Sequence, residues 1–274
     1  MITASIVLYK TSQKETETIV HSVIQSKSIE KLYIIDNSPT DALSWVKDLS
    51  PIIEYIKNKN TGYGSSHNIA LRKAIERNSD YHIVLNPDII FEPHVIPKIK
   101  EYMDSNSDIG LTMPKVVYPD GTLQYLCKLI PTPLDLIFKR FLPQYISNKI
   151  TYKFQLKFTT YNKEMEVPYL SGCFMFLRTS ALKKIGIFDE RFFMYPEDID
   201  ISRRMNEQYK TMYYPAVSVI HAHAAESYKS KKMLFIHIKN IIIYFNKWGW
   251  VFDKKRKETN KRILKNLHYK KGVY

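Results

Sequence analysis

Cysteine is almost absent from this chain of 274 residues. Its two cysteines, Cys127 and Cys173, lie in apolar surroundings and do not form a Cys-x-x-Cys pair. Their placement favours two free, buried thiols in a protein that works in a reducing compartment.

Long apolar runs are missing as well. No stretch approaches the ~18–20 apolar residues that a membrane span requires. The apolar start, residues 1–8, is too short for a signal peptide and lacks its basic region. We therefore expect a cytoplasmic protein. Its 45% apolar and 25% charged residues are typical of globular proteins, and its length suits one large α/β domain or two small ones.

Acidic residues are scarce, which leaves a net charge of +14. The excess is concentrated in residues 226–274, which hold 14 Lys and Arg against three Asp and Glu. The remaining residues are close to neutral, and this argues against a nucleic-acid groove across the body of the protein. The distribution indicates an anionic surface that meets the C-terminus.

The first half of the chain alternates between predicted strands and helices, which is typical of βαβ units and a mostly parallel sheet. Ligands of such sheets bind at the carboxyl ends of the strands. Polar residues follow all four strands, at 9–10, 36–38, 57–60 and 86–88, so they could converge on one ligand. We predict strands at 2–8, 31–35, 52–56 and 81–85, and helices at 13–25 and 65–77.

The second half is less regular. Prolines break up residues 109–143, and residues 130–165 show no clear period, so we interpret them as a variable excursion or lid. Regular patterns return afterwards, and neither internal repeats nor low-complexity segments are present. We predict strands at 167–177, 211–214 and 217–220, and helices at 181–185, 197–208, 230–247 and 254–268.

Two short motifs follow strands. The sequence NTGYG at 60–64 precedes a helix, where glycines let the backbone approach a phosphate or sugar. It lacks the third glycine of a dinucleotide fingerprint, and a simple tight turn is the alternative. Asp88 in Asn-Pro-Asp can ligate a divalent cation through oxygen, or belong to an Asx-type turn.

Three carboxylates, Glu197, Asp198 and Asp200, open a predicted helix. The helix dipole stabilises acids there by roughly 0.3–1 kcal/mol each. Three such groups exceed what capping needs, and their mutual repulsion raises a pKa, which suits a general base. Glu197 and Asp200 share a helix face and Asp198 points elsewhere. Arg203 and Arg204 are near enough to pair with them.

His221 and His223 follow the strand predicted at 217–220. A lone histidine at the end of a strand is usually not a ligand. One of them could instead complete a metal site with Asp88, although no spacing rule shows this.

The helix predicted at 230–247 is aliphatic and aromatic, and Trp248 and Trp250 precede the basic residues 254–257. A core helix with a solvated tail is one interpretation. We favour an interfacial helix on an anionic membrane, where basic residues contribute about 1 kcal/mol each. The aromatic residues are not interleaved as in a nucleic-acid stacking platform.

Taken together, several motifs resemble those of the family 2 glycosyltransferases of the GT-A fold, and most of all the bacterial rhamnosyltransferases of O-antigen and capsule assembly. The resemblance covers about residues 1–250. It implies a GT-A domain at 1–225, with a nucleotide-sugar half at about 1–115 and an acceptor half at about 116–225. The C-terminal helices at 226–274 would associate with a membrane. The motifs are IDNS (35–38), NTGYG (60–64), NIA (68–70), LNPD (85–88), SGCFMFLR (171–178), GIFDERFFMY (186–195), EDID (197–200) and VIH (219–221).

The resemblance implies an inverting transfer from a nucleotide-sugar to an acceptor hydroxyl. The favoured donor is dTDP-rhamnose, with a UDP- or GDP-sugar as the alternative. The acceptor would be a lipid-diphosphate-linked saccharide at the cytoplasmic face of the bacterial cell membrane, with the protein bound peripherally there.

The resemblance also assigns roles. Asp36 would recognise the nucleobase, Asp88 and His221 would hold Mg²⁺ or Mn²⁺ with the diphosphate, and Asp198, beside Glu197, would be the general base. The donor-binding residues would be Tyr9, Asp36, Asn37, Asn60, Gly62, Asn68, Asn86, Asp88 and Arg204, and the acceptor-binding residues Ser171, Gly172, Asp189 and Tyr195.

One departure affects the metal. Asn86 stands where the family's Asp-x-Asp motif has its first carboxylate, so metal affinity would be modest, and a metal-independent variant using Lys10, Lys59 or Arg204 stays open. Two other classes remain. A nucleotidyltransferase would need a glycine-rich loop near the N-terminus, and residues 8–16 lack glycine. A non-catalytic module of a glycan-assembly complex is the other alternative.

Overall fold

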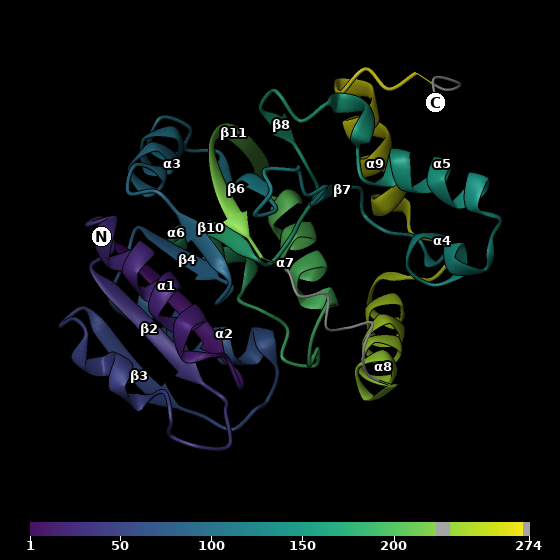
Figure 1. The fold of residues 1–274 in the computed structure, drawn as a ribbon. Helices are drawn as coiled ribbons and strands as arrows, with labels where there is room; N and C mark the ends of the chain where they lie inside the picture. The colour runs from purple at the N-terminus through teal and green to yellow at the C-terminus, as the bar shows by residue number, and fades with distance from the viewer. Residues whose placement is uncertain (223–230, 271–274) are drawn as a thin grey trace.

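A central sheet flanked by helices dominates the computed structural model, which describes residues 1–222 and 231–270 (Figure 1). In its first half, four strands pair in parallel in the order β3-β2-β1-β4. All residues of β1 and β4 are buried, because helices cover the sheet. The elements are β1 (Ile2–Leu8), α1 (Gln13–Gln25), β2 (Lys31–Asp36), η1 (Ser44–Asp48), β3 (Ile53–Lys57), α2 (Tyr63–Glu76) and β4 (Tyr81–Leu85).

The second half extends the same sheet in the order β4-β10-β6-β11-β5. Strand β10 is antiparallel to its neighbours, and β6 and β11 are parallel to each other. The predicted α/β class with a mostly parallel sheet is therefore confirmed. The elements here are β5 (Ile89–Phe91), α3 (Val95–Asp104), β6 (Ile109–Val117), β8 (Met165–Glu166), β10 (Phe174–Arg178), α6 (Thr179–Ile185), α7 (Pro196–Asn206) and β11 (Lys210–His221).

The strand predicted at 167–177 is in fact two strands. Strand β9 (Tyr169–Leu170) pairs with β7 (Cys127–Lys128) in a separate two-stranded sheet, and only β10 joins the main sheet. Gly172 lies in the connection, where an added Cβ atom would lie 3.2 Å from Cβ of Asp198. The break thus lets the backbone meet α7, which a pattern of buried residues alone does not reveal.

The excursion predicted at 130–165 contains helices: α4 (Pro133–Leu136), η2 (Phe138–Phe141), α5 (Gln144–Phe154) and η3 (Lys157–Thr159). The prolines that hid the period begin two of these helices, since Pro133 is the first residue of α4 and Pro143 caps α5. The strands predicted at 211–214 and 217–220 are one strand, β11, with a register shift between Tyr214 and Ser218. Both cysteines are free and buried as predicted.

Helices α8 (Lys231–Trp248) and α9 (Lys254–Asn266) pack against the domain (Figure 1). Both guanidinium nitrogens Nη1 and Nη2 of Arg203 on α7 donate to Asp253, at 2.7 and 2.8 Å, and both side chains are buried. Asn260 on α9 exchanges two hydrogen bonds with the backbone of Ile130. Within the described residues, the helices are all too short or too polar to cross a membrane.

Candidate active site

The carboxyl ends of β2 and β3 open into a cavity of about 600 Å³, lined by residues 37–39 and 57–60. Asp36 lies beneath it, fully buried, and accepts hydrogen bonds from the Tyr55 hydroxyl at 2.7 Å and the Ser38 amide at 2.8 Å. Asn37 accepts from Asn58 at 2.9 Å. Of the predicted donor residues, Asn37 and Asn60 therefore line one cavity.

The start of α2 is occupied by the chain itself. Gly62 has a φ of +113°, and a Cβ atom there would collide with the carbonyl oxygen of Phe193. The Tyr63 amide donates to that same oxygen at 2.8 Å. We predicted a donor contact for Gly62, but the glycine is buried and its conformation serves this close approach of two backbones.

Asn68 has a similar structural role in place of the predicted donor contact. Its side chain is fully buried, donates to the Phe188 carbonyl and to Glu190, both at 2.9 Å, and accepts from the Phe188 amide at 3.0 Å. These bonds use its hydrogen-bonding groups to hold the loop that precedes α7. Helix α2 therefore positions the carboxylate end of α7.

Asp88 and His221 lie next to each other, although 133 positions separate them in the sequence. The Asp88 Oδ1 atom is 3.2 Å from Nε2 of His221, and Nδ2 of Asn86 is 3.3 Å from the same nitrogen. His223, the second histidine of the predicted pair, lies outside the described residues. The structure thus brings together Asn86, Asp88 and His221 near the end of β4.

Gln124 orients the His221 ring, a role that the sequence did not indicate. Its amide nitrogen donates to the backbone carbonyl of His221 at 2.7 Å, so its amide oxygen faces Nδ1 at 2.9 Å. In the neutral ring this arrangement keeps the proton on Nδ1 and turns the lone pair of Nε2 toward Asp88.

A carboxylate oxygen and an imidazole lone pair at 3.2 Å repel each other unless a proton or a cation lies near both. The donor set therefore fits a divalent cation. Within residues 1–222 and 231–270, however, no three His, Cys, Asp or Glu side chains cluster closely enough to hold a metal by themselves. Diphosphate oxygens of a donor would have to complete the coordination.

The Tyr63 hydroxyl links this corner to the carboxylates of α7. It lies 2.9 Å from Oδ1 of Asn86 and 2.8 Å from the carbonyl oxygen of Gly172. The Gly172 amide in turn donates to Asp198 at 3.1 Å. One short chain of contacts therefore connects the predicted metal corner to the predicted base.

Asp198 is half-buried at the start of α7. Its Oδ2 atom accepts from the Gly172 amide and lies 3.4 Å from the Tyr169 hydroxyl, and its Oδ1 atom accepts from the Ile199 amide at 2.8 Å. Burial raises the pKa of Asp198 to about 6, and the nearby Lys128 ammonium acts in the opposite direction. Ser171, predicted to bind the acceptor, is half-buried beside Gly172.

Glu197 is buried, and its Oε2 atom has no hydrogen-bond partner within the described part of the chain. Burial, and then the charge of Asp198, raise the pKa of Glu197 well above its usual range. Because the charge of Asp198 opposes ionisation of Glu197, Asp198 is the member of the adjacent pair that ionises first.

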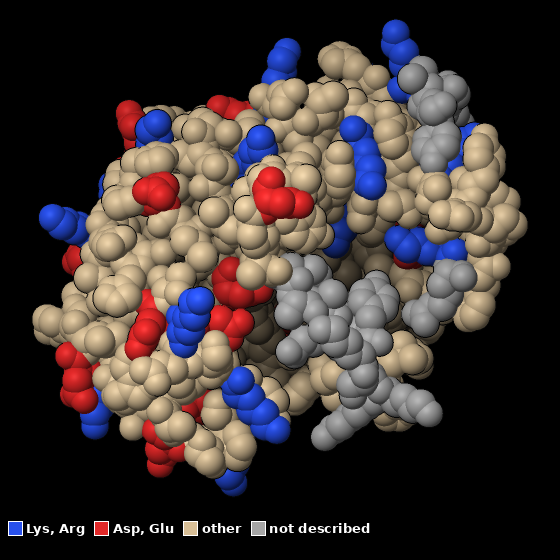
Figure 2. Space-filling model, in the orientation of Figure 1, with Lys and Arg blue, Asp and Glu red and all other residues tan. Residues whose placement is uncertain are grey.

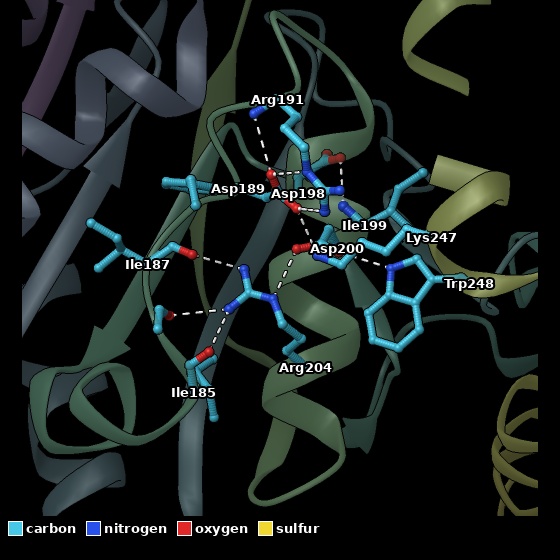
Figure 3. Close-up of polar contacts among 12 residues, drawn as sticks. Ile185, Ile187, Asp189, Arg191, Asp198, Ile199, Asp200, Arg204, Lys247 and Trp248 are labelled. Carbon is cyan, nitrogen blue, oxygen red and sulfur yellow. Dashed lines mark hydrogen bonds and ion pairs between the residues drawn. The ribbon is translucent and has the colours of Figure 1, made fainter. Parts of the chain in front are cut away.

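Asp200 faces away from Asp198, as the spacing predicted, and binds other parts of the protein (Figure 3). It is fully buried and accepts from Nε of Arg204, Nε1 of Trp248 and Nζ of Lys247, at 2.8, 2.8 and 2.6 Å. Arg204 also donates to the carbonyl of Ile187. These contacts give Arg204 a structural role in place of the predicted donor contact, while Arg203 pairs with Asp253.

Asp189 and Tyr195, predicted at the acceptor pocket, both lie against α8. Asp189 accepts from Lys247 at 2.8 Å, and the Arg191 guanidinium, helped by Lys247, lowers its pKa. The Tyr195 ring stacks on His237 with 4.6 Å between ring centroids, and its φ of +92° is in the left-handed region. Such backbone strain in a residue other than glycine is frequent at functional sites.

Lys128 and Tyr169 were absent from the sequence prediction. They lie on the paired strands β7 and β9, and Nζ of Lys128 is 4.9 Å from the centre of the Tyr169 ring. The Tyr169 hydroxyl contacts Asp198. The two residues are 41 positions apart, and only this strand pairing brings them together. The sequence alone therefore could not indicate that both belong to the site.

Comparison with known proteins identifies the family of the chain. The sequence model of the family described as "Glycosyl transferase family 2" matches residues 5–186, more than half of the chain. The chain therefore belongs to this family, and it is a glycosyltransferase.

Curated relatives include bacterial rhamnosyltransferases. The N-acetylglucosaminyl-diphospho-decaprenol L-rhamnosyltransferase of Mycobacterium tuberculosis is 28% identical over 181 residues, which are 61% of this chain and 57% of that protein. The chain thus spans little more than half of that relative. Rhamnosyltransferase WbbL of Escherichia coli K12 is 26% identical over 249 residues, 87% of this chain and 86% of that protein.

Solved glycosyltransferases share the GT-A fold. A structure of GalNAc-T7 with UDP, GalNAc and Mn²⁺ aligns with a TM-score of 0.64 at 15% identity, over 98% of this chain and 56% of that one. The mannosyltransferase PcManGT of Pyrobaculum calidifontis, with GDP-Man and Mn²⁺, aligns with a TM-score of 0.59 at 12% identity, over 97% and 69%.

Proposed function

We propose that this glycosyltransferase transfers L-rhamnose from dTDP-rhamnose to a hydroxyl group of a lipid-linked saccharide, with inversion at the sugar carbon. The position of Asp198 carries the proposal. It ionises before its neighbour Glu197, and burial raises its pKa to about 6, which suits a base that works near neutral pH. Tyr63 connects its surroundings to the corner formed by Asn86 and Asp88.

In the proposed reaction, Asp198 accepts the proton of the acceptor hydroxyl as its oxygen attacks C1 of the donor sugar. The new C1–O bond forms on the face opposite the bond that breaks, so the configuration inverts. The leaving nucleoside diphosphate takes the electron pair of the broken bond. A divalent cation bound with Asp88 and His221 would supply Lewis-acid stabilisation of that charge.

The remaining residues hold the two substrates in this proposal. The cavity at the ends of β2 and β3 receives the nucleoside, with Asn37 and Asn60 lining it and Asp36 beside it, and the exposed Tyr9 after β1 contacts the same donor. Ser171, Gly172, Asp189 and Tyr195 border the acceptor. The curated M. tuberculosis relative, named for a diphospho-decaprenol acceptor, supports an acceptor of that type. In this proposal the acceptor is used at the inner face of the bacterial membrane during O-antigen or capsule assembly.

The donor is tested with a panel of nucleotide-sugars in the presence of Mn²⁺. We expect dTDP-rhamnose to raise the melting temperature most, because the true donor should have the lowest Kd. A ligand at 100 times its Kd stabilises the folded state by about 2.7 kcal/mol. Slow release of free rhamnose from the same donor is the second readout. A larger shift of the melting temperature with a UDP- or GDP-sugar would identify that sugar as the donor instead. The absence of hydrolysis with every donor would contradict catalysis.

Replacing Asp88 with Ala should weaken binding of dTDP in the presence of Mn²⁺. We expect a loss at least as large as the about 10–100-fold effect of removing a residue that only orients a metal ligand. Isothermal titration with Mn²⁺ and with a chelator measures it. The exposed Asp120 is the matched control, since Asp120→Ala removes the same group from a surface turn. Equal affinity of the wild-type protein with and without chelator would contradict the metal role.

A further inference from the structure

Helix α8 presents a row of exposed apolar side chains. Leu234, Phe235, Ile238 and Ile242 lie within about 100° of one another around the helix axis and are exposed, Phe235 to 70%. Nearer the C-terminal end of the helix, Ile241, Tyr244 and Phe245 are buried against the rest of the protein. The helix therefore packs through its C-terminal turns and exposes apolar side chains mainly along its N-terminal turns.

Two neighbouring segments expose apolar side chains to a still greater extent. In the loop after α8, Val251 is 75% and Phe252 is 96% exposed. In η2, Phe138 and Phe141 are exposed, Phe141 to 76%, and Tyr145 of α5 is exposed as well. We name the exposed apolar residues of α8, of the 250–252 loop and of the α4–α5 segment the apolar face.

The three parts of the apolar face are connected. The Arg256 guanidinium lies 3.1 Å from the Trp250 carbonyl oxygen, 3.3 Å from that of Val251 and 3.4 Å from that of Pro131, two residues before α4. The Trp250 ring contacts Phe245 on α8, with centroids 5.1 Å apart. The loop is thus fixed between α8 and the start of α4, and these helices lie together on the right of Figure 1.

The surroundings of the apolar face are strongly basic. Residues 131–158 hold five Lys and Arg and one Asp, and residues 231–270 hold twelve Lys and Arg and two acids. One of these acids, Asp253, is buried in its pair with Arg203. Figure 2 shows that acidic side chains lie mainly on the left, with little red over α4, α5 and α9, whereas Lys and Arg lie on both sides.

We infer that the apolar face docks on a bilayer of anionic lipid, an inference that rests on the proposed lipid-linked acceptor. Large exposed apolar groups with a basic rim complement an interface of acyl chains and anionic headgroups. A second copy of the chain fits less well, since it would bring two basic rims together.

This inference keeps the interfacial helix that the sequence predicted at 230–247, adds the 250–252 loop and the α4–α5 segment, and leaves α9 out of the membrane contact. Helix α9 is held against the protein: Arg256 and Ile263 are buried, and Arg262 pairs with Glu166 at 2.6 Å. Helix α9 supports the α4–α5 segment through its contacts with Ile130 and Pro131. The side chains that would insert into the bilayer come from the three parts of the apolar face.

The docking also places the acceptor. Lys128, close to Asp198, precedes the first residue of α4 by five positions, and five residues span at most ~17 Å. A saccharide whose lipid stays in the bilayer would therefore have only a short distance to bridge to the base.

Vesicle sedimentation tests the docking without any catalysis. The variants are Phe141→Asp, Phe235→Asp and Phe252→Asp, one in each part of the apolar face, and the triple variant. Leu49→Asp is the matched control, an exposed apolar residue beside η1 in the N-terminal half. Thermal melts verify that each variant is folded.

We expect the wild-type protein to bind phosphatidylglycerol vesicles more tightly than phosphatidylcholine vesicles. Each Asp substitution should weaken binding about tenfold, the triple variant by at least about a hundredfold, and the control by less than twofold. No binding of the wild-type protein to anionic vesicles would overturn the inference. So would a dimer that the triple variant dissociates, because the apolar face would then join two copies.

Activity on a short-chain, water-soluble acceptor separates this inference from the proposed function. If the protein binds vesicles as expected but transfers no sugar to any such acceptor, the proposed reaction fails and the docking surface stands. If the protein transfers sugar but does not bind vesicles, the proposed reaction stands and the docking surface fails.

Discussion

Replacing Asp198 with Asn should lower the rate of sugar transfer by about a thousandfold, the middle of the range for loss of a general base. The amide has the shape of the carboxyl group, and its single oxygen can still accept from one of the two backbone amides, of Gly172 or of Ile199, that bind the carboxylate. It cannot take a proton from the acceptor hydroxyl. Steady-state transfer measures the loss, and titration with dTDP should show donor binding within about threefold of wild type.

The substitution Asp120→Asn is the control, because it makes the same chemical change on an exposed turn. We expect this variant to keep wild-type turnover. An Asp198→Asn protein with near wild-type turnover would show that another group takes the proton.

The acid side of the pH profile provides a second test of the same base. Because the pKa of Asp198 is raised to about 6, the carboxylate is lost as the pH falls through this value, and kcat/KM should fall tenfold per unit below it. Replacing Lys128 with Met should move this limb to higher pH, since the Lys128 ammonium lowers the pKa of Asp198. If the acid limb of the pH profile is unchanged in the Lys128→Met variant, the Lys128 charge does not influence the pKa of the base.

Replacing Arg203 with Met should lower the free energy of unfolding by about 3–5 kcal/mol, the range for breaking a buried ion pair on one side. Methionine fills similar apolar space but leaves Asp253 buried without its partner at 2.7 Å. Contact of the guanidinium with the Trp248 ring, at 3.9 Å, is lost as well. Urea unfolding, followed by circular dichroism, measures the change.

Lys100 provides the comparison for this effect. It pairs with Asp104 across one helical turn, and both side chains are more than 40% exposed. Lys100→Ala should therefore cost less than about 1 kcal/mol. Similar losses in the two variants would mean that burial does not govern the strength of the Arg203 pair.

The sequence predicted those parts of the fold and site that depend on local patterns. The strands β1 to β4 and helix α1 follow from apolar runs and turns, and the strand-end position of Asp88 follows from the same reasoning. The opposed directions of Asp198 and Asp200 follow from helical spacing.

The features that it did not predict depend on contacts between distant segments. Gly62 looked like part of a ligand loop, yet its conformation serves the approach of Phe193. Asn68 looked like a donor ligand and instead holds Phe188. Gln124 and Lys128 belong to the site only through their contacts with His221 and Tyr169. No periodicity or composition encodes such pairs.

The first turn of α7 has two sides that belong to different neighbours. Asp198 faces β9 and the connection that contains Gly172, whereas Asp200, two residues later, is fastened to Lys247 and Trp248 at the end of α8 (Figure 3). A rigid turn transmits position, so a displacement of α8 would tilt Asp198 against its fixed neighbours. The last turn of α8 thus helps to fix the position of Asp198, the carboxylate that we propose as the base.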